Sequence, residues 1–169
     1  MMPRLLCLAL AVPALFALSA AGQDEKKEPR PLAPRRYRVD LAAAQFPQAA
    51  PDEALKSIVK AVDGQRIDYL LAQLADPAYV DRKVNEYKAL IDKGPEDAKV
   101  LLAFDRLVRE TRQHFDTDPL LVRELRAFAK DGMWNVEDAA ATGTAKAVPA
   151  HKVFMKRIGD RWFLENRQQ

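Results

Sequence analysis

The stretch 152–164, Lys-Val-Phe-Met-Lys-Arg-Ile-Gly-Asp-Arg-Trp-Phe-Leu, decides the fold class that this sequence predicts. β-branched and aromatic residues concentrate in both of its halves, which is typical of strands. Gly159 and Asp160 separate the halves, and a glycine there allows the positive φ angle that tight hairpin turns need. We therefore predict two antiparallel strands, Lys152–Ile158 and Arg161–Asn166, joined by a two-residue turn.

Two further strands are predicted just before this hairpin. They are Met133–Ala139 and Thr144–Val148, where β-branched and aromatic residues again occur close together. The residues between them, 139–143, form a looser connection, and we interpret Thr142-Gly143-Thr144 as a turn. The C-terminal part of the chain is therefore expected to be an antiparallel meander.

Residues 51–132 instead show apolar side chains at helical spacing. Asp52, Asp76 and Asp118 are the expected N-caps, and a proline follows each of the last two at the first helical position. Gly64, Gly94 and Gly132 are expected to end helices. We predict five helices, which begin near residues 52, 67, 77, 95 and 119.

Helices followed by a meander define an α+β fold, with the N-terminal helices packed on the C-terminal sheet. The helices are expected to cover one face of the sheet, because Trp134, Phe154, Trp162 and Leu164 need burial. The same aromatic side chains, together with Phe163, are candidates for lining a pocket, but core packing is the interpretation that we favour.

The first 22 residues have the order of a secretory signal peptide: the charged Arg4, an apolar run over 5–18, and small residues over 19–22. We predict cleavage after Ala21 or Gly22 and export to the periplasm or the extracellular space. The alternative is a membrane anchor, but the run is near the lower length limit for spanning a bilayer and Pro13 interrupts it. Cleavage removes Cys7, the one cysteine, so the mature chain is expected to have neither a disulfide nor a transmembrane segment.

Residues 23–50 are rich in proline, alanine and charge, and we interpret them as a largely extended linker before a single domain at 51–169. As an alternative, Tyr37–Leu41 forms a short strand or docks on the domain. The chain carries a net charge of +3, and its excess of basic residues lies in this linker. A basic stripe on the folded part is missing, so we expect no nucleic-acid partner. The cluster Arg35-Arg36-Tyr37-Arg38 is interpreted as solvated, with contact to an anionic envelope surface as the alternative.

The hairpin at 152–164 resembles the closing hairpin of nuclear transport factor two-like domains, in which a Gly-Asp turn leads to a strand that opens with a basic residue and a tryptophan. The segments 52–62 and 68–71 resemble the first helices of the same superfamily. The three helices predicted between residues 77 and 131 depart from its usual pattern. The resemblance implies a bent, cone-like sheet around a cavity. Members include isomerases, dehydratases and cyclases as well as non-catalytic binding and dimerisation modules, so fold alone does not choose a function.

No residue is assigned a catalytic, cofactor-binding or metal-binding role from the sequence, and no cofactor is expected. Tyr69, Tyr79, Asp68 and Asp76 lie near the expected mouth of the cavity, but their spacing is not diagnostic. The run 114–118, His-Phe-Asp-Thr-Asp, has nitrogen and oxygen ligands for a metal, and we favour a polar helix end with Asp118 as a cap.

Two other candidate residues also have structural interpretations. Ser57 lies inside a predicted helix, and no Gly-x-Ser-x-Gly elbow accompanies it. His151 follows Pro149 near the start of a strand and is expected at the surface.

Three functional hypotheses follow from these observations. The first, which we favour, is a non-enzymatic exported domain that binds a small molecule or a protein partner. The second is a small cofactor-independent lyase or isomerase that works in a cone-shaped pocket. The third is a module tethered to the cell envelope, with the basic cluster at 35–38 touching an anionic surface. A homodimer is left open.

Overall fold

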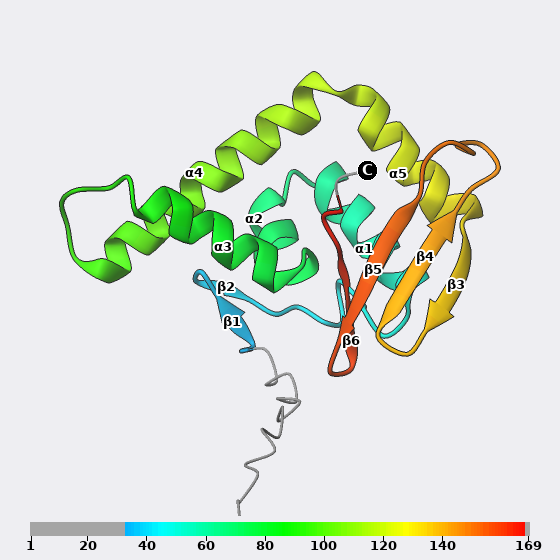
Figure 1. Cartoon of the computed structure of the whole chain (residues 1–169), viewed down its shortest axis with the longest axis horizontal. Helices are drawn as coiled ribbons and strands as arrows, with labels where there is room; N and C mark the ends of the chain where they lie inside the picture. The colour runs from blue at the N-terminus through cyan, green and yellow to red at the C-terminus, as the bar shows by residue number, and fades with distance from the viewer. Residues whose placement is uncertain (1–32, 168–169) are drawn as a thin grey trace, which may run out of the picture.

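A computed structural model describes residues 33–167 of the chain. The predicted signal peptide at 1–22 and residues 23–32 lie outside this part. Within it, helices precede an antiparallel sheet, so the predicted α+β order is confirmed (Figure 1). The helical elements are α1 (Pro51–Asp63), α2 (Ile67–Tyr69), the π-helical turn η1 (Leu70–Leu74), α3 (Pro77–Lys88), α4 (Glu96–Thr117) and α5 (Pro119–Asp131).

The sheet is a meander of four strands, each paired antiparallel with the next along the chain. The hairpin turn falls where the sequence predicts it, and Gly159 has a φ of 63°. Met155 faces Leu164 and Arg157 faces Trp162 across this hairpin. The strands are β3 (Met133–Glu137), β4 (Ala140–Thr144), β5 (Val153–Ile158) and β6 (Arg161–Leu164).

The second strand of the sheet corrects the sequence prediction. β4 occupies Ala140–Thr144, so Thr144–Val148 is not a strand and Thr142-Gly143-Thr144 is not a turn. The physical reason is Trp134 of β3, whose ring lies directly over Gly143. A Cβ on Gly143 would stand 2.9 Å from that ring, so small residues are needed where the sequence pattern indicates a loop.

The helix boundaries are confirmed at two of the three expected caps. Asp76 accepts a hydrogen bond from the Ala78 N–H, and Asp118 accepts from the N–H groups of both Leu120 and Leu121. Asp52 is not a cap, because Pro51 already occupies the first helical position. Nor does Gly94 end a helix: α3 stops at Lys88, and Gly94, with a φ of 120°, lies in the loop before α4.

The second predicted helix divides into the short α2 and the π-helical turn η1. The Ala75 N–H bonds to the Leu70 carbonyl, which is the wider spacing of a π-turn. Every side chain of η1 is buried, including that of Gln73. This turn therefore brings a polar side chain into the interior of the molecule.

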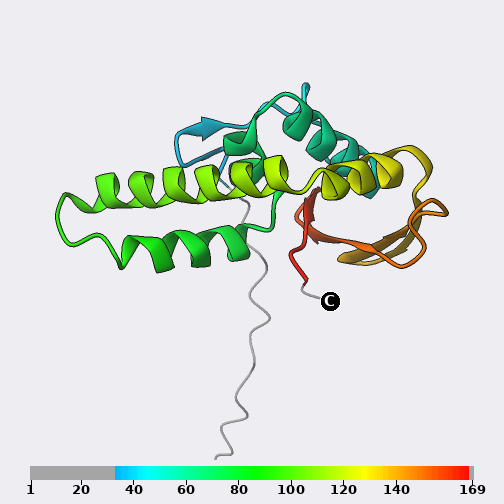
Figure 2. The same cartoon turned by 90° about the horizontal axis from the view of Figure 1, so that it is seen from above.

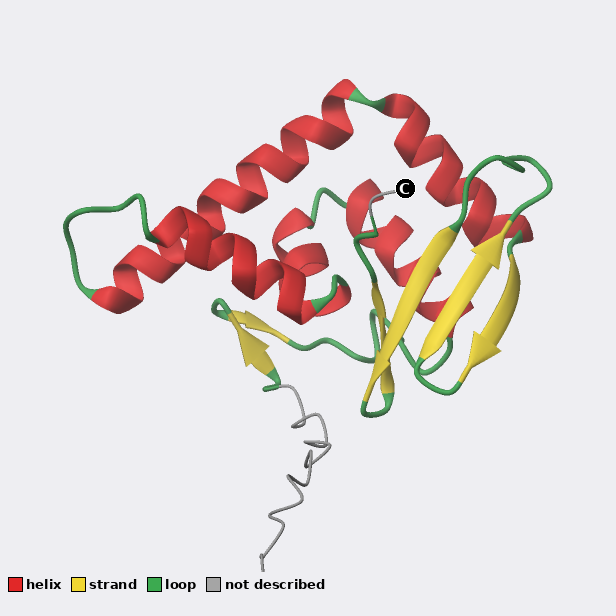
Figure 3. Cartoon of the chain, viewed as in Figure 1, coloured by secondary structure: helices red, strands yellow, loops and turns green. Residues whose placement is uncertain are grey.

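The helices form an arch beside the sheet. α3 and α4 are an antiparallel pair that projects away from the sheet, and the chain bends at Asp118 so that α5 returns toward it (Figures 1 and 3). Figure 2 shows the sheet on one side of α5 and α1 on the other.

Residues 33–50, which we call the strap, fold onto the helices and are not an extended tether. β1 (Arg35–Arg36) and β2 (Val39–Asp40) form a small hairpin, and Phe46 and Gln48 further along are buried. Tyr37 and Arg38 at its turn have φ angles of 50° and 63°, which cost energy for residues with a Cβ. Of the alternative for residues 37–41, the structure shows a short strand at Val39–Asp40 and a Tyr37 side chain that docks on the helices.

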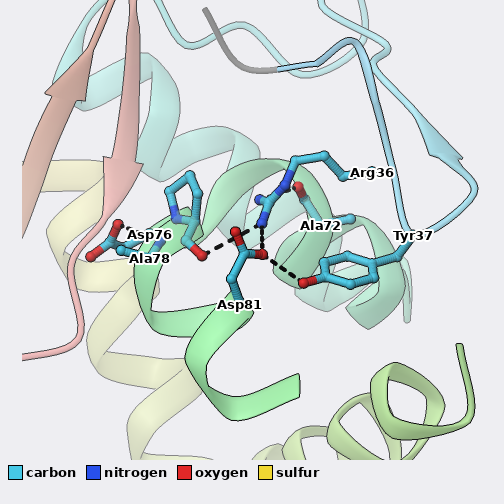
Figure 4. Close-up of polar contacts among 7 residues, drawn as sticks. Arg36, Tyr37, Ala72, Asp76, Ala78 and Asp81 are labelled. Atoms are coloured by element: carbon cyan, nitrogen blue, oxygen red, sulfur yellow. Dashed lines mark hydrogen bonds and ion pairs between the residues drawn. The ribbon is translucent and has the colours of Figure 1, made fainter. Parts of the chain in front are cut away.

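Two residues of the basic cluster, Arg36 and Tyr37, anchor the strap, which corrects the interpretation of the whole cluster as solvated (Figure 4). Arg35 and Arg38 are exposed, as that interpretation expects. Arg36, whose side chain is 9% exposed, donates to the Ala72 carbonyl over 2.9 Å and forms an ion pair with Asp81. The Tyr37 hydroxyl donates to the same carboxylate over 2.6 Å, and its ring stacks on Phe104 at 4.3 Å between centroids. Arg36 and Tyr37 therefore join the strap to η1, α3 and α4.

Three polar side chains join the strap, η1 and β6, and we call Gln48, Gln73 and Arg161 the glutamine–arginine clasp. The Gln48 amide donates to the carbonyls of Gln73, at 3.1 Å, and Trp162, at 2.8 Å. Arg161 donates to the Oε1 atoms of both glutamines, at 2.8 and 3.2 Å. Burial lowers the pKa of the Arg161 guanidinium. The clasp thus satisfies a half-buried charge with carbonyl and amide oxygens.

Candidate functional site

A cavity of about 540 Å³ lies beneath the arch, and we call it the arch cavity. Its walls come from η1, α3, α4 and α5 on the helical side and from β5, β6 and residues 165–167 on the sheet side. The floor consists of leucine side chains that these elements turn inward, and most of them are buried. They are Leu70, Leu71, Leu107, Leu121, Leu125 and Leu164.

Helical spacing explains the polar wall above this floor. Tyr79, Lys83 and Tyr87 recur every four residues along α3, so they stand on one face of that helix. Glu110 and His114 have the same spacing on the facing α4. The two helices therefore offer their polar side chains to the same opening.

The Tyr87 hydroxyl donates a hydrogen bond to the Glu110 carboxylate across this opening. That bond, followed by burial, raises the pKa of the Tyr87 phenol. Glu110 also accepts from Arg106 over 2.8 Å, and the two hydrogen bonds lower the pKa of its carboxyl group. Both shifts move away from neutral pH, so tyrosine stays protonated and glutamate stays ionised.

Most charged groups in the lining are neutralised by a partner on the protein itself. Lys83 pairs with Glu86 over 2.7 Å, and Glu165 pairs with Arg167 over 2.9 Å. Lys152, which lies just before β5, has no acidic partner within 4 Å among residues 33–167. The lining therefore leaves a positive charge unpaired on its sheet side.

The residues expected near a cavity mouth are only partly brought together. Tyr79 lines the arch cavity. Tyr69 is buried elsewhere, and its hydroxyl accepts from the Ala42 N–H over 3.1 Å. Asp68 pairs with Arg66, and Asp76 is a cap. Sequence order alone therefore did not indicate which of these four face a common space.

The run 114–118 does not assemble a metal site in the structure. His114 lines the arch cavity, whereas Asp118 caps α5 and Asp116 is exposed. In the described part of the chain, no group of three or more histidine, cysteine, aspartate or glutamate side chains is placed to hold a metal ion. Here the interpretation as a helix end with a cap is the one that the geometry supports.

The remaining candidates have structural roles. The Ser57 hydroxyl donates to the Pro47 carbonyl over 2.7 Å and so holds the strap on α1. His151 is exposed, as expected, and contacts Glu124 at 2.8 Å. Trp162 and Phe163 are buried.

The other two aromatic candidates lie partly exposed. Trp134 is half-buried over Gly143, and Phe154 lines the arch cavity. Phe154 is therefore the aromatic strand residue that meets the interpretation as pocket lining.

Sequence reasoning did not single out Lys83, Glu110 or Lys152 as site residues. Tyr87 follows Val80 and Val84 at helical spacing, a pattern that indicates its face of the helix but not its polar contact. The Tyr87–Glu110 pair is separated by 23 residues, and its signal in the sequence is a tyrosine and a glutamate on the facing stripes of two consecutive helices. Such a signal indicates packing more often than a site.

Comparison with models of known protein families, with curated proteins and with solved structures gave no match to this chain. Among residues 33–167, none of the helices is both long and apolar enough to cross a membrane.

Proposed function

We propose that this chain is a non-enzymatic exported domain that holds the apolar part of a small molecule in the arch cavity. The observation that carries the proposal is a concave cavity that is lined mainly by leucine side chains and has polar groups at its rim. Small-molecule sites are typically concave, mostly apolar and about 300–1,000 Å³ in volume, with a few polar groups that orient the ligand. The arch cavity has this composition and size.

The pKa shifts at the rim favour binding over the alternative of a lyase or isomerase. A general acid or base works best when its pKa lies near the operating pH. The Tyr87–Glu110 contact moves the phenol further above neutral pH and the carboxyl group further below it. The pair is therefore suited to joining α3 to α4 rather than to moving protons.

The strap gives less support to envelope tethering. Arg36 and Tyr37 are used inside the molecule, and Arg35 forms an ion pair with Asp40 over 3.3 Å. Export itself remains part of the proposal and is supported by the N-terminal sequence pattern. The cone-like sheet and the kinship with nuclear transport factor two-like domains are likewise proposals, supported by the hairpin at 152–164 and by a cavity between helices and sheet.

The test uses N-phenyl-naphthylamine, an uncharged dye whose fluorescence rises in apolar surroundings. The protein should increase the emission of this dye. Thr111→Trp places a large ring in the cavity lining and should abolish the increase. Gln113→Trp adds the same ring two residues away on the exposed side of α4 and should leave binding unchanged.

A second filling variant guards against misfolding of the first. Leu121→Trp enters the cavity from α5 instead of α4. Circular dichroism and urea unfolding report whether each variant is folded. Equal dye binding by the protein and by both folded filling variants would refute the proposal.

A further inference from the structure

The charges around the arch cavity select among apolar ligands, and this inference rests on the proposed function. The leucine floor alone would accept any apolar molecule of the right size. Specificity must therefore come from the polar groups that remain available after the protein has paired its own charges. The sign of the charge on these available groups therefore decides which head group the cavity prefers.

The acidic side chains of the lining are both occupied. Glu110 is bound by Tyr87 and Arg106, and Glu165 is bound by Arg167. A cationic ligand would have to displace one of these partners. Because such an exchange gives no net gain in pairing, the lining offers little to an ammonium group.

The basic side chains give the opposite result. Lys83 and Arg167 have partners, but Lys152 does not have an acidic one within residues 33–167. Lys152 stands on the sheet side of the cavity next to Val153, which belongs to the apolar lining. A ligand that buries its chain against Val153 and the leucines therefore reaches an unneutralised ammonium group at the edge.

We propose that the arch cavity binds a single-chain amphiphile with an anionic head group, whose alkyl chain lies on the leucine floor and whose head group pairs with Lys152. A carboxylate and a phosphate share the chemistry that Lys152 recognises, since a lysine binds either as a point charge. His114 lies on the opposite wall of the cavity, and the proposed pairing between Lys152 and the head group does not require it.

Displacement of N-phenyl-naphthylamine tests the head group. Dodecanoate, dodecyl phosphate, dodecanol and dodecylamine share one chain and differ in charge. We expect either anion to displace the dye at a concentration about tenfold lower than the amine, a typical gain for one charge-assisted contact. The better of the two anions identifies the head group.

Two substitutions locate the effect. Lys152→Gln should remove the preference for anions, and Lys152→Glu should reverse it. Lys146→Gln, a matched change at an exposed lysine in the same connection between β4 and β5, should leave the preference intact.

The outcomes separate this inference from the proposed function. If the dye binds but all four amphiphiles displace it equally, the cavity is a binding site without charge selection and the inference is wrong. If the anion preference survives in Lys152→Gln, Lys152 is not the partner and the inference is equally wrong. If the dye does not bind at all, the proposed function itself fails.

Discussion

The glutamine–arginine clasp and the arch cavity both combine polar and apolar side chains, yet they use them in opposite ways. In the clasp, Gln48, Gln73 and Arg161 fill their space and bond to one another and to backbone carbonyls. Among residues 33–167, no buried side-chain nitrogen or oxygen lacks a partner. In the arch cavity, the polar groups pair at the rim of a concave space that is lined mainly by leucine side chains. Polar groups therefore hold the fold together in one region and frame an open space in the other.

The largest loss of stability is expected for the core residue Phe104, on the side of the helices that the strap covers. Phe104→Ala removes the ring on which Tyr37 stacks and opens the core, and should lower the free energy of unfolding by about 3–5 kcal/mol. Urea unfolding measures this loss. Leu102→Ala on the same helix, at a side chain that is 55% exposed, should cost less than about 0.5 kcal/mol. Equal effects would mean that α4 does not bury the face that the structure assigns.

Removing the guanidinium group of Arg161 from the clasp should clearly lower the stability of the protein. Arg161→Met keeps much of the volume but leaves the Oε1 atoms of Gln48 and Gln73 without their donor. Each unsatisfied buried acceptor is costly, so we expect a loss of about 1–3 kcal/mol in unfolding experiments. Arg157→Met, on the neighbouring strand at an exposed position, provides the comparison and should be nearly neutral.

The strap anchor should make stability depend on alkaline pH. Burial, and then the hydrogen bond to Asp81, raise the pKa of the Tyr37 phenol. The unfolded chain releases this proton above its ordinary pKa of about 10, while the folded protein keeps it. Stability from this group is therefore complete below pH of about 10 and declines as the pH rises further.

Chemical denaturation between neutral and strongly alkaline pH measures this decline. Tyr37→Phe keeps the stacking on Phe104 and removes the titrating hydroxyl, so its curve should fall less steeply with pH. A curve for Tyr37→Phe that parallels that of the unmodified protein would show that Tyr37 is not the group responsible.

The smallest effect on stability is expected at the cavity. Lys152 is exposed and forms no ion pair with residues 33–167, so Lys152→Gln should change the free energy of unfolding by less than about 0.5 kcal/mol. A thermal melt checks this expectation. A large loss would show that Lys152 contributes to the fold, and the contrast between clasp and cavity would then be weaker than we describe.

The sequence predicts well those elements whose signals are local. The hairpin at Gly159 and the caps at Asp76 and Asp118 were found because each depends on a few neighbouring residues. The sequence pattern did not predict β4, because its alanines and its glycine have low strand propensity. Small residues are present there because the Trp134 ring on the adjacent strand leaves no room for a larger side chain at Gly143. Of the candidate site, the sequence offered Tyr79, His114 and Phe154, but not the fact that they share one cavity.

The sequence by itself determined the order of helices and strands, since hydrophobic period, turn residues and capping side chains act within one or two turns of chain. Tertiary structure decided the role of the strap and the existence of the arch cavity. Arg36 meets Asp81 from 45 residues away, and Gln48 meets Arg161 from 113 residues away. Local propensity does not predict such long-range pairings. Burying a charge or an amide costs free energy unless the group is hydrogen-bonded. In the folded chain, distant segments supply the hydrogen-bond partners that offset this cost.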